Sequence, residues 1–261
     1  MLPLSGPAAA PRGLRRSVDL FRAFRLEQSD PDLFYRAQAD DSLAQAAEHI
    51  DPVGKLVLDI GGGAGWFSEA FRSAGATCVL VEPEAGRPPA PDASAHALAI
   101  HPGRLVPGWT VAADGNLMPF PDAAADLTFS SNVLEHVPDP ARFLAEMVRV
   151  TRPGGLLYLS FTAWLSPWGG HETAPWHYLG GKRAADRYRR RHGRPPGNLY
   201  GTSLFPRYVG EVLRLVGARA DLDVLVAGPR YYPRWLAWVS RVPGLRELAT
   251  WNLLLIMRRR P

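Results

Sequence analysis

The chain has 261 residues, a formal net charge of +5 and a hydrophobic share of 46%. This composition excludes a disordered or fibrous chain and fits one α/β domain with an insertion or appended helices. Its single cysteine, Cys78, excludes an internal disulfide and a thiolate metal site, so a cytoplasmic location is expected. Neither a secretory signal nor a transmembrane helix is predicted, because the sequence lacks an apolar stretch of the required length.

The N-terminal part is predicted to be a flexible tail followed by two helices. Residues 1–16 are rich in Pro, Ala and Arg and form the tail in this interpretation. The helices are expected over Val18–Gln28 and Pro31–Ile50, and together they make an N-terminal cap, residues 17–50. Asp30 supplies an N-cap, and the proline after it suits the first helical position.

Residues 51–163 alternate between short apolar runs and helical segments. Buried strands are predicted at Leu56–Ile60, Cys78–Glu82, Trp109–Ala113, Leu127–Ser131 and Leu156–Phe161. Helices are predicted at Trp66–Ala74, ended by Gly75, and at Pro140–Thr151, ended by Pro153-Gly154-Gly155. Apolar strands that alternate with helices indicate a parallel sheet covered on both faces.

After the fifth strand this rhythm breaks. Residues 164–202 are interpreted as an insertion over the site, and residues 203–261 return to helix and strand. The last part should contain a helix at Phe205–Val216 and strands at Leu222–Val226 and Asn252–Arg258. The predicted fold class is therefore α/β: a Rossmann-like, seven-stranded, mostly parallel sheet with helices on both faces, in a single domain over residues 17–261.

A glycine-rich turn follows the first predicted strand, with glycines at Gly61, Gly63 and Gly65. Such a turn lets the backbone approach a ligand at the N-terminus of the next helix. Asp59, at the strand end, can hold a cationic amino group directly or through water. The dinucleotide fingerprint needs glycine at its sixth position, which is Trp66 here, so an NAD(P)-dependent oxidoreductase is disfavoured.

Glu82 ends the second predicted strand, 23 positions after Asp59. At this distance an acidic side chain can accept hydrogen bonds from both hydroxyls of a ribose. The alternative is a solvated acid at a strand end. Asp114 ends the third strand just before Gly115, where an ordinary Asp-Gly turn is the alternative to a ligand contact.

The run from Leu117 to Val137, with Asn132 and His136 in it, and the segment 152–155 complete a pattern over roughly residues 56–162. This pattern resembles the class I S-adenosylmethionine-dependent methyltransferases, in particular the small-molecule type that includes ubiquinone and menaquinone enzymes. The resemblance implies S-adenosylmethionine as cofactor and S-adenosylhomocysteine as product. It implies cofactor contacts from Asp59, Gly61, Gly63, Gly65, Glu82, Asp114, Gly115 and Asn132, with Asp114 at the adenine amino group.

Two segments of the insertion, Gly169–Glu172 and His177–Gly181, resemble a group of actinobacterial methyltransferases. Members of that group have been linked to the mycolate-containing cell envelope, so the resemblance implies an envelope context. The predicted reaction is methyl transfer to a small molecule or to a lipid or glycolipid precursor; oxygen is the favoured acceptor atom, and carbon and nitrogen stay open as alternatives. A non-catalytic regulatory or scaffold protein that binds S-adenosylmethionine is the alternative.

Three histidines are candidates for the acceptor side. His136 should lie near the transferring methyl, as a base or as a wall of the acceptor site, with a structural histidine as the alternative. His171 and His177, beside Glu172 and Tyr178, provide a base or pack with hydrogen bonds among the tryptophans of the insertion. The spacing of these residues matches no recognised ligand pattern, so no metal is expected.

Two observations disfavour nucleic acid as the acceptor. The loop after the fourth strand reads Ser131-Asn132-Val133-Leu134, without the Asn/Asp-Pro-Pro-Tyr loop of adenine-N6 enzymes. Cys78 lies inside a buried strand and so does not fit the nucleophile of a cytosine-C5 enzyme. The sequence carries no signal for an oligomeric state.

A basic stretch and an aromatic segment suggest a membrane as a partner. Seven cations in thirteen positions favour a solvated helix face or an anionic ligand; they are Lys182, Arg183, Arg187, Arg189, Arg190, Arg191 and Arg194. Tyr231–Arg241 mixes aromatics with arginine inside Pro233–Trp251, which is predicted to form two short amphipathic helices. Such a helix suits a membrane interface or covers a core equally well. Peripheral contact with the anionic inner leaflet is therefore a hypothesis.

Overall fold

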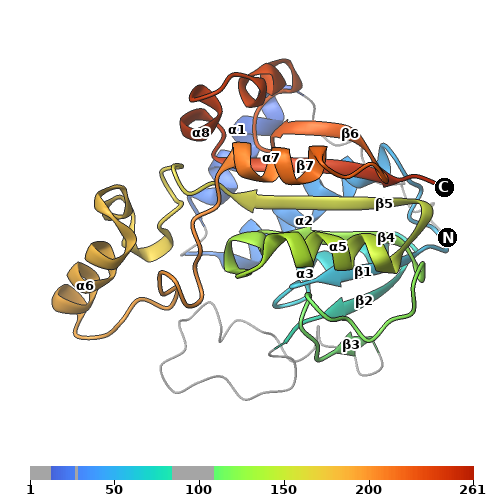
Figure 1. The fold of residues 1–261 in the computed structure, drawn as a ribbon, viewed down its shortest axis with the longest axis horizontal. Coiled ribbons are helices and arrows are strands. Elements are labelled where there is room, and N and C mark those ends of the chain that lie inside the picture. The colour runs from blue at the N-terminus through green and yellow to red at the C-terminus, as the bar shows by residue number, and fades with distance from the viewer. Residues whose placement is uncertain (1–12, 27–28, 84–108) are drawn as a thin grey trace, which may run out of the picture.

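The computed structural model describes residues 13–26, 29–83 and 109–261, which build one seven-stranded sheet. The strand order is β3-β2-β1-β4-β5-β7-β6 (Figure 1). The strands are β1 (Leu56–Ile60), β2 (Thr77–Val81), β3 (Thr110–Val111), β4 (Ala125–Ser131), β5 (Thr151–Thr162), β6 (Leu222–Pro229) and β7 (Asn252–Arg259). Neighbours from β3 to β5 pair in parallel, and β7 runs antiparallel to both β5 and β6. The predicted Rossmann-like fold with a mostly parallel sheet is confirmed.

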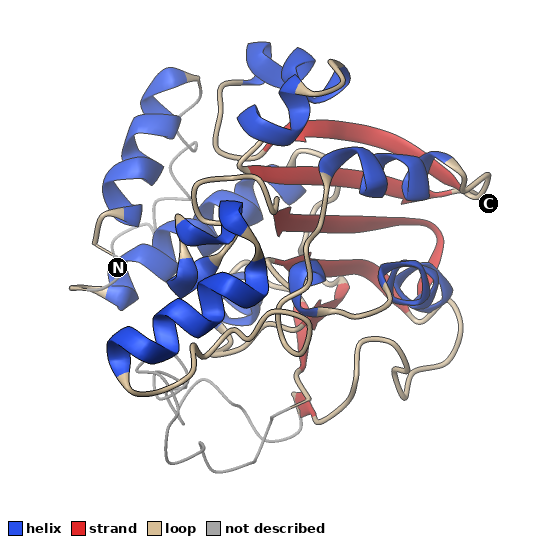
Figure 2. Cartoon of the chain, turned by 60° about the vertical axis from the view of Figure 1, so that its left-hand side comes forward, coloured by secondary structure: helices blue, strands red, loops and turns tan. Residues whose placement is uncertain are grey.

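Helices cover both faces of the sheet (Figures 1 and 2). They are α1 (Leu14–Phe24), α2 (Pro31–Ala47), α3 (Trp66–Ser73), α5 (Pro140–Val150), α6 (Gly181–His192), α7 (Val209–Gly217) and α8 (Leu245–Ala249). Successive side chains of β1 point to opposite faces, as strand geometry requires. Leu58 packs in the cluster that contains α5 and α7, whereas Val57 packs in the cluster that contains α2 and α3. Two apolar layers therefore hold the carboxyl ends of the strands in fixed positions.

The insertion lies between β5 and α7, beyond the carboxyl end of β5 (Figure 1). It contains α6 and two short 3₁₀ helices, η2 (His171–Thr173) and η3 (Trp176–Leu179). A further 3₁₀ helix, η1 (Leu134–His136), follows β4 at the same edge of the sheet. The predicted pair of short helices near the C-terminus is present as η4 (Arg234–Arg241) and α8.

The boundaries predicted for β1 and for the start of α3 match the structure, while the starts of α1, β5 and α7 are among those that differ. Helix α1 already begins at Leu14, so the tail predicted over residues 1–16 is too long; Arg16 pairs with Asp41 of α2 and stabilises this first turn. Strand β5 begins at Thr151, and the glycines predicted to stop a helix lie within the strand. Helix α7 begins at Val209, after the predicted start at Phe205.

Strand β3 is shorter than predicted and spans only two residues. It pairs with β2 alone and forms the edge of the sheet, where Trp109 stays 39% exposed. Among the described helices, each is too short or too polar to cross a bilayer, in agreement with the sequence.

Candidate functional site

The glycine turn connects β1 to α3 at the carboxyl edge of the sheet. Gly61 and Gly63 have φ angles of 72° and 52°, a region that glycine adopts without steric cost. Gly65, with φ 79°, is the N-cap of α3. A Cβ atom on Gly61 would lie 2.6 Å from Cγ2 of Val133, whereas a Cβ on Gly63 would meet none of the described residues within 4 Å. The turn therefore packs against the chain that follows β4 and leaves room for a ligand at Gly63.

Asp59 lies beneath this turn, and its side chain is only 1% exposed. Its Oδ2 atom accepts a hydrogen bond from the Ser68 hydroxyl at 2.7 Å, and a Cβ on Gly62 would overlap this carboxyl group. Burial raises the pKa of Asp59 to about 7. This placement does not fit the direct contact with an amino group that the sequence suggested; Asp59 supports the turn, and a contact through water stays a prediction.

Glu82 follows β2 directly and turns back toward the glycine turn. Its Oε2 atom accepts a hydrogen bond from the backbone N–H of Gly63 at 3.0 Å, and the side chain is half-buried. The carboxylate is thus fixed beside the open space at Gly63. This position agrees with the ribose contact predicted from the sequence, which remains a prediction.

Asp114, Gly115 and Asn132 lie at the same edge. Asp114 is exposed, and its Oδ1 accepts from the backbone N–H of Asn116 at 2.8 Å, the turn hydrogen bond that was the alternative interpretation. A Cβ on Gly115 would lie 2.5 Å from Cε2 of Phe143, so only glycine fits there. Asn132 adopts φ 58°, and its Oδ1 accepts from Nδ2 of Asn252 at 2.7 Å. Because β3, β2, β1 and β4 are neighbours, the predicted cofactor residues lie in a row along the carboxyl edge of the sheet.

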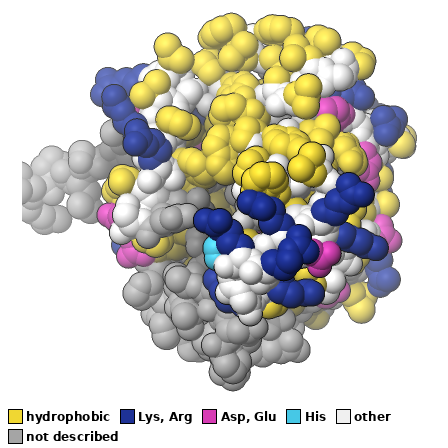
Figure 3. Space-filling view, turned by 90° about the vertical axis from the view of Figure 1, so that its left-hand side faces the viewer, with side chains coloured by type: hydrophobic (Ala, Val, Ile, Leu, Met, Phe, Trp, Pro, Cys, Tyr) yellow, Lys and Arg dark blue, Asp and Glu magenta, His cyan; other side chains and the backbone are white. Residues whose placement is uncertain are grey.

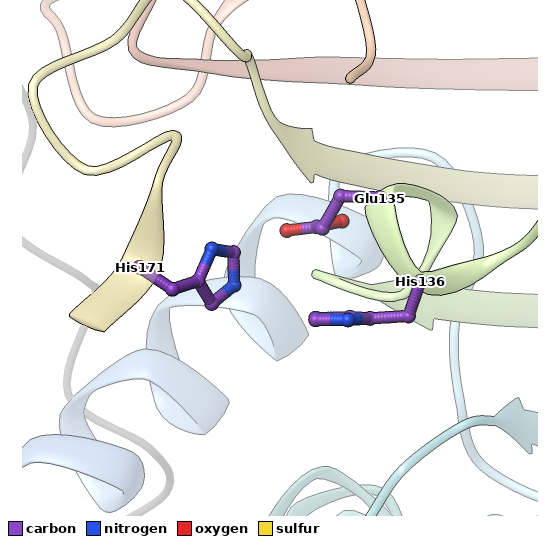
Figure 4. Close-up of side chains that lie close together, drawn as sticks. All are labelled: Glu135, His136 and His171. Carbon is purple, nitrogen blue, oxygen red and sulfur yellow. The ribbon is translucent and has the colours of Figure 1, made fainter. Parts of the chain in front are cut away.

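The structure brings His136 and His171 together, although they are 35 positions apart in the sequence. Their rings meet edge to face with centroids 5.1 Å apart. His136 belongs to η1, and its Nδ1 lies 2.6 Å from the carbonyl oxygen of Ser203. His171 belongs to η2 in the insertion and faces His136 (Figure 4). The site therefore joins the end of β4 to the insertion.

Glu135 completes this group and was missed by the sequence analysis. Its side chain is 2% exposed; Oε1 accepts from the backbone N–H of Thr162 at 3.0 Å, and Oε2 has no hydrogen-bond partner among the described residues. One ligand-type atom from each of Glu135, His136 and His171 lies within 4.8 Å of the others. The sequence signal was present in the Leu134-Glu135-His136 triplet, but only the fold shows that His171 joins it.

Arg207 holds η1 in place. Its guanidinium donates to the carbonyl oxygens of Leu134 at 3.2 Å and Pro138 at 3.1 Å, and also to that of Val137. The side chain is buried, and burial lowers the pKa of Arg207 from its usual value. These bonds satisfy the carbonyl groups of the short helix and fix the backbone on which Glu135 and His136 stand.

His177 lies apart from this group. It is 1% exposed, its Nε2 lies 3.2 Å from the carbonyl oxygen of Ser166, and its ring packs edge to face on Trp164 with centroids 5.2 Å apart. Glu172 instead points to Asn198, with Nδ2 to Oε1 at 3.1 Å. The predicted polar cluster is therefore divided: the contacts of His177 agree with the packing interpretation, and its role as a base stays a prediction.

Arg230 is a second residue that the sequence analysis missed. It is 1% exposed and donates to the hydroxyls of Ser42, Ser131 and Ser160 at 2.6, 2.8 and 3.0 Å. Its own carbonyl oxygen accepts from Arg16 at 2.9 Å. The network ties the N-terminal helices to the carboxyl ends of β4 and β5. Arginine is seldom buried, so the sequence gives little signal for this role.

Comparison with known proteins agrees with this fold and site. A family model described as a methyltransferase domain matches residues 58–159. Proteins named uncharacterized methyltransferase from Mycobacterium sp. (strain KMS) and Mycobacterium tuberculosis (strain ATCC 25177 / H37Ra) are 49% and 48% identical over 251 residues. These alignments cover 94% of this chain in both cases and 95% and 94% of the relatives.

Solved structures show the same fold at low sequence identity. An S-adenosylmethionine-dependent methyltransferase from Mesorhizobium loti superposes with a TM-score of 0.52 at 20% identity, covering 83% of this chain and 96% of that chain. A protein from Pyrococcus horikoshii gives a TM-score of 0.54 at 14% identity, covering 93% and 99%.

The sheet order and the row of residues at its carboxyl edge define a class I methyltransferase scaffold. The match to the mycobacterial relatives over nearly the whole chain shows that this protein belongs to the class I S-adenosylmethionine-dependent methyltransferase family. S-adenosylmethionine is the cofactor of that family. The resemblances predicted from the sequence, to this family and to actinobacterial relatives, are both confirmed.

Proposed function

We propose that this protein transfers the methyl group of S-adenosylmethionine to a hydroxyl oxygen of a small molecule or of a lipid or glycolipid precursor. One observation carries the proposal: Glu135, His136 and His171 converge at the carboxyl end of β4 (Figure 4). Val133, two residues before Glu135, packs against Gly61 of the glycine turn. Groups that can act on a hydroxyl therefore stand beside the predicted donor site.

The donor side fits the cofactor. The open space at Gly63 admits a ligand, and the carboxylate of Glu82 lies next to it, ready to accept hydrogen bonds from ribose hydroxyls. When bound, S-adenosylmethionine supplies an electrophilic methyl group on a sulfonium. Asp114 and the backbone of Gly115 would face the adenine from the end of β3.

The acceptor side can receive a proton. If the Nδ1–H of His136 donates to the Ser203 carbonyl, its Nε2 keeps a free lone pair. Burial lowers the pKa of His171, so this imidazole is neutral near pH 7 and can also accept a proton. The insertion that carries His171 lies over the site and helps to align the acceptor and exclude water, which supplies much of the acceleration of a displacement reaction.

The first test of this proposal is a calorimetric titration with S-adenosylhomocysteine and, separately, with NAD. We expect binding of S-adenosylhomocysteine, and an affinity loss on the order of 100-fold in Glu82→Ala, because two hydrogen bonds to a charged group are lost. Glu172→Gln is the matched control, since Glu172 belongs to the insertion and accepts a hydrogen bond from Asn198 there rather than bonding the glycine turn. Binding of NAD alone would end the proposal.

The second test separates an enzyme from a scaffold. The protein is incubated with methyl-labelled S-adenosylmethionine and with aqueous and lipid extracts of an actinobacterium. Label that alkali does not release as methanol excludes a methyl ester, and release of labelled iodomethane by hot hydriodic acid, which cleaves methyl ethers under conditions that leave C-methyl groups intact, then supports an O-methyl product. If S-adenosylhomocysteine binds but no extract becomes labelled, the scaffold alternative replaces the enzyme.

The surface supports a lipid-linked acceptor in a cell-envelope context. One face carries a broad apolar area next to a cluster of cations (Figure 3). Exposed apolar side chains on η4 and α8 include Trp235, Trp238 and Leu248, which are 71%, 49% and 60% exposed. The cations of α6 are exposed as well. An anionic membrane surface complements both features, and we propose that this protein acts in the cytoplasm and meets its acceptor at the inner leaflet.

Co-sedimentation tests this contact with vesicles of phosphatidylglycerol and with vesicles of phosphatidylcholine. We expect binding to the anionic vesicles at low salt, weaker binding in Trp235→Ala, and little binding to the neutral vesicles. Equal recovery in the supernatant for both vesicle types would remove the membrane from the proposal and leave a soluble acceptor.

A further inference from the structure

We propose that Glu135, His136 and His171 form a binding site for one divalent transition metal ion, of which Zn²⁺ fits the ligand set best. The ion would keep one coordination position open for the acceptor oxygen. The sequence analysis expected no metal, because His171, Glu172 and His177 match no recognised ligand spacing; it did not consider Glu135 together with His136 and His171. The site itself stands on the geometry of the chain; its role in catalysis rests on the proposed function.

The first observation is the convergence of three ligand-type side chains. Their ligand atoms lie within 4.8 Å of one another, and Figure 4 shows the side chains facing a common point from η1 and η2. In a tetrahedral zinc site with bonds of about 2.1 Å, ligand atoms lie about 3.4 Å apart. The group would therefore contract by at most about 1.4 Å around an ion.

The second observation is the state of the Glu135 carboxylate. It is 2% exposed, and its Oε2 atom has no hydrogen-bond donor within the part of the chain that the structure describes. An unpaired buried carboxylate oxygen costs free energy unless a cation or a donor meets it. A metal ion between the three side chains would supply the missing partner.

Arg230 is the competing source of positive charge near Glu135. Burial opposes the charge of its guanidinium, but nearby groups, Glu135 among them, together raise the pKa of Arg230 above its usual value. Its Nη1 and Nη2 donate to serine hydroxyls instead. Arg207 likewise directs its guanidinium at the carbonyls around η1. Both arginines balance charge at a distance, yet neither donates a hydrogen bond to Oε2 among the described contacts. Neither arginine therefore occupies the position at Oε2 where a metal ion would bind.

The surroundings of the three residues resemble the outer shell of metal sites. Metal-binding histidines usually donate their second ring nitrogen to a carbonyl or a carboxylate, which orients the ring and fixes its tautomer. His136 does so toward Ser203, leaving Nε2 for the ion. The carboxylate of Glu135 is oriented in turn by the N–H of Thr162. Two of the three ligands are therefore held in position before any ion binds.

Three protein ligands and an open position are typical of catalytic rather than structural zinc. A hydroxyl oxygen bound at the open position has a lowered pKa and releases its proton to water. The oxygen then forms the O–CH₃ bond while the C–S bond of the cofactor breaks. The electron pair of the C–S bond stays on sulfur, which gives S-adenosylhomocysteine. In this arrangement the imidazoles act on the acceptor through the metal.

The test is a calorimetric titration of tag-free, chelator-treated protein with ZnCl₂, repeated with Co²⁺ while its visible absorption is recorded. We expect one ion per chain and cobalt bands of low-symmetry nitrogen and oxygen coordination. Glu135→Gln, His136→Gln and His171→Gln should each weaken binding by at least about 100-fold, since even outer-shell partners are worth about 10–100-fold. His192→Gln, an exposed histidine of the same insertion, is the matched control and should bind normally.

The same samples are titrated with S-adenosylhomocysteine, which also reports whether each variant is folded. Binding of S-adenosylhomocysteine without uptake of Zn²⁺, or equal uptake by the His171→Gln variant, overturns the metal site and leaves the proposed function intact. Uptake of Zn²⁺ at this site without binding of S-adenosylhomocysteine overturns the proposed function and leaves the metal site intact.

Discussion

The donor side of the site is built from a backbone turn and acids at strand ends, whereas the acceptor side is built from imidazoles and a buried carboxylate. The donor side consists of consecutive elements, in which Glu82 bonds Gly63 across only 19 positions of the chain. The acceptor side needs η1 and the insertion, and it depends on Arg207 to fix η1. The two sides meet where Val133 packs against Gly61.

This difference suggests a division of labour. Any class I enzyme must hold the same donor, so its glycine turn and acids can be built from one short motif. The acceptor differs between enzymes, and here an insertion brings His171 to the end of β4. Variants on the donor side should therefore change cofactor binding, and variants on the acceptor side should change turnover.

The largest expected effect is on turnover in His136→Gln. Loss of an acid–base or metal-binding imidazole at the reacting oxygen should reduce the rate of methyl transfer by about 10²–10⁴-fold. The affinity for S-adenosylhomocysteine should stay nearly unchanged, because Val133, and not His136, is the residue of this segment that packs against the glycine turn. Label incorporation and calorimetry measure the two quantities on the same preparation.

His177→Asn provides the comparison for that variant, because His177 packs on Trp164 away from the group. Its melting temperature should fall, while the turnover of the protein that remains folded should change little. A loss of turnover equal to that of His136→Gln would restore His177 as a functional residue and would contradict the division between packing and chemistry described above.

The donor side could be predicted from the sequence because its signals are local. An apolar run of five residues, three glycines and an acid at a fixed spacing define β1, the turn and Glu82, and the structure agrees with each position. Asp59 differs only in its orientation: the sequence locates it at the strand end, but the packing of Ser68 and Gly62 around it decides that it points beneath the turn.

The acceptor side could be predicted only in part because it depends on long-range packing. His136 and His171 were both candidates, but their contact arises from irregular 3₁₀ turns that lack the periodicity from which helices are recognised. Glu135 and Arg230 were missed for a related reason. Burial of a charged side chain is set by its tertiary partners, and the sequence around each residue does not reveal them.

The next effect concerns the pH dependence of stability on the donor side. The unfolded chain releases the Asp59 proton near pH 4, whereas the folded chain releases it near pH 7, because burial raises the pKa of Asp59 to about 7. Between these pH values the folded state binds more protons, so this residue lowers the free energy of unfolding as the pH rises. Asp59→Asn removes the titration, and its stability relative to wild type should improve between pH 4 and 8 by on the order of 4 kcal/mol.

Urea unfolding at several pH values measures this difference, and taking the difference between the two proteins cancels the other titrating groups. The Ser68 hydroxyl can still donate to the amide oxygen of the variant, so the fold around the turn should persist. A constant difference between the two proteins across this range would show that Asp59 is already ionised at low pH, and hence that a cation or donor reaches its Oδ1 atom.

The smallest effect tests the contact between the two sides. Gly61→Ala adds left-handed strain of about 1–2 kcal/mol and pushes a methyl group against Val133, which costs about 1–3 kcal/mol more. Gly193→Ala is the matched control, since Gly193 has φ 69° and open space around it, so that only the strain remains. We expect Gly61→Ala to lose about 3 kcal/mol of unfolding free energy, and Val133→Ala to recover part of that loss in the double variant. Equal losses at Gly61 and Gly193 would mean that the turn does not press on the chain leading to Glu135, and the donor and acceptor sides would then have to communicate through the cofactor alone.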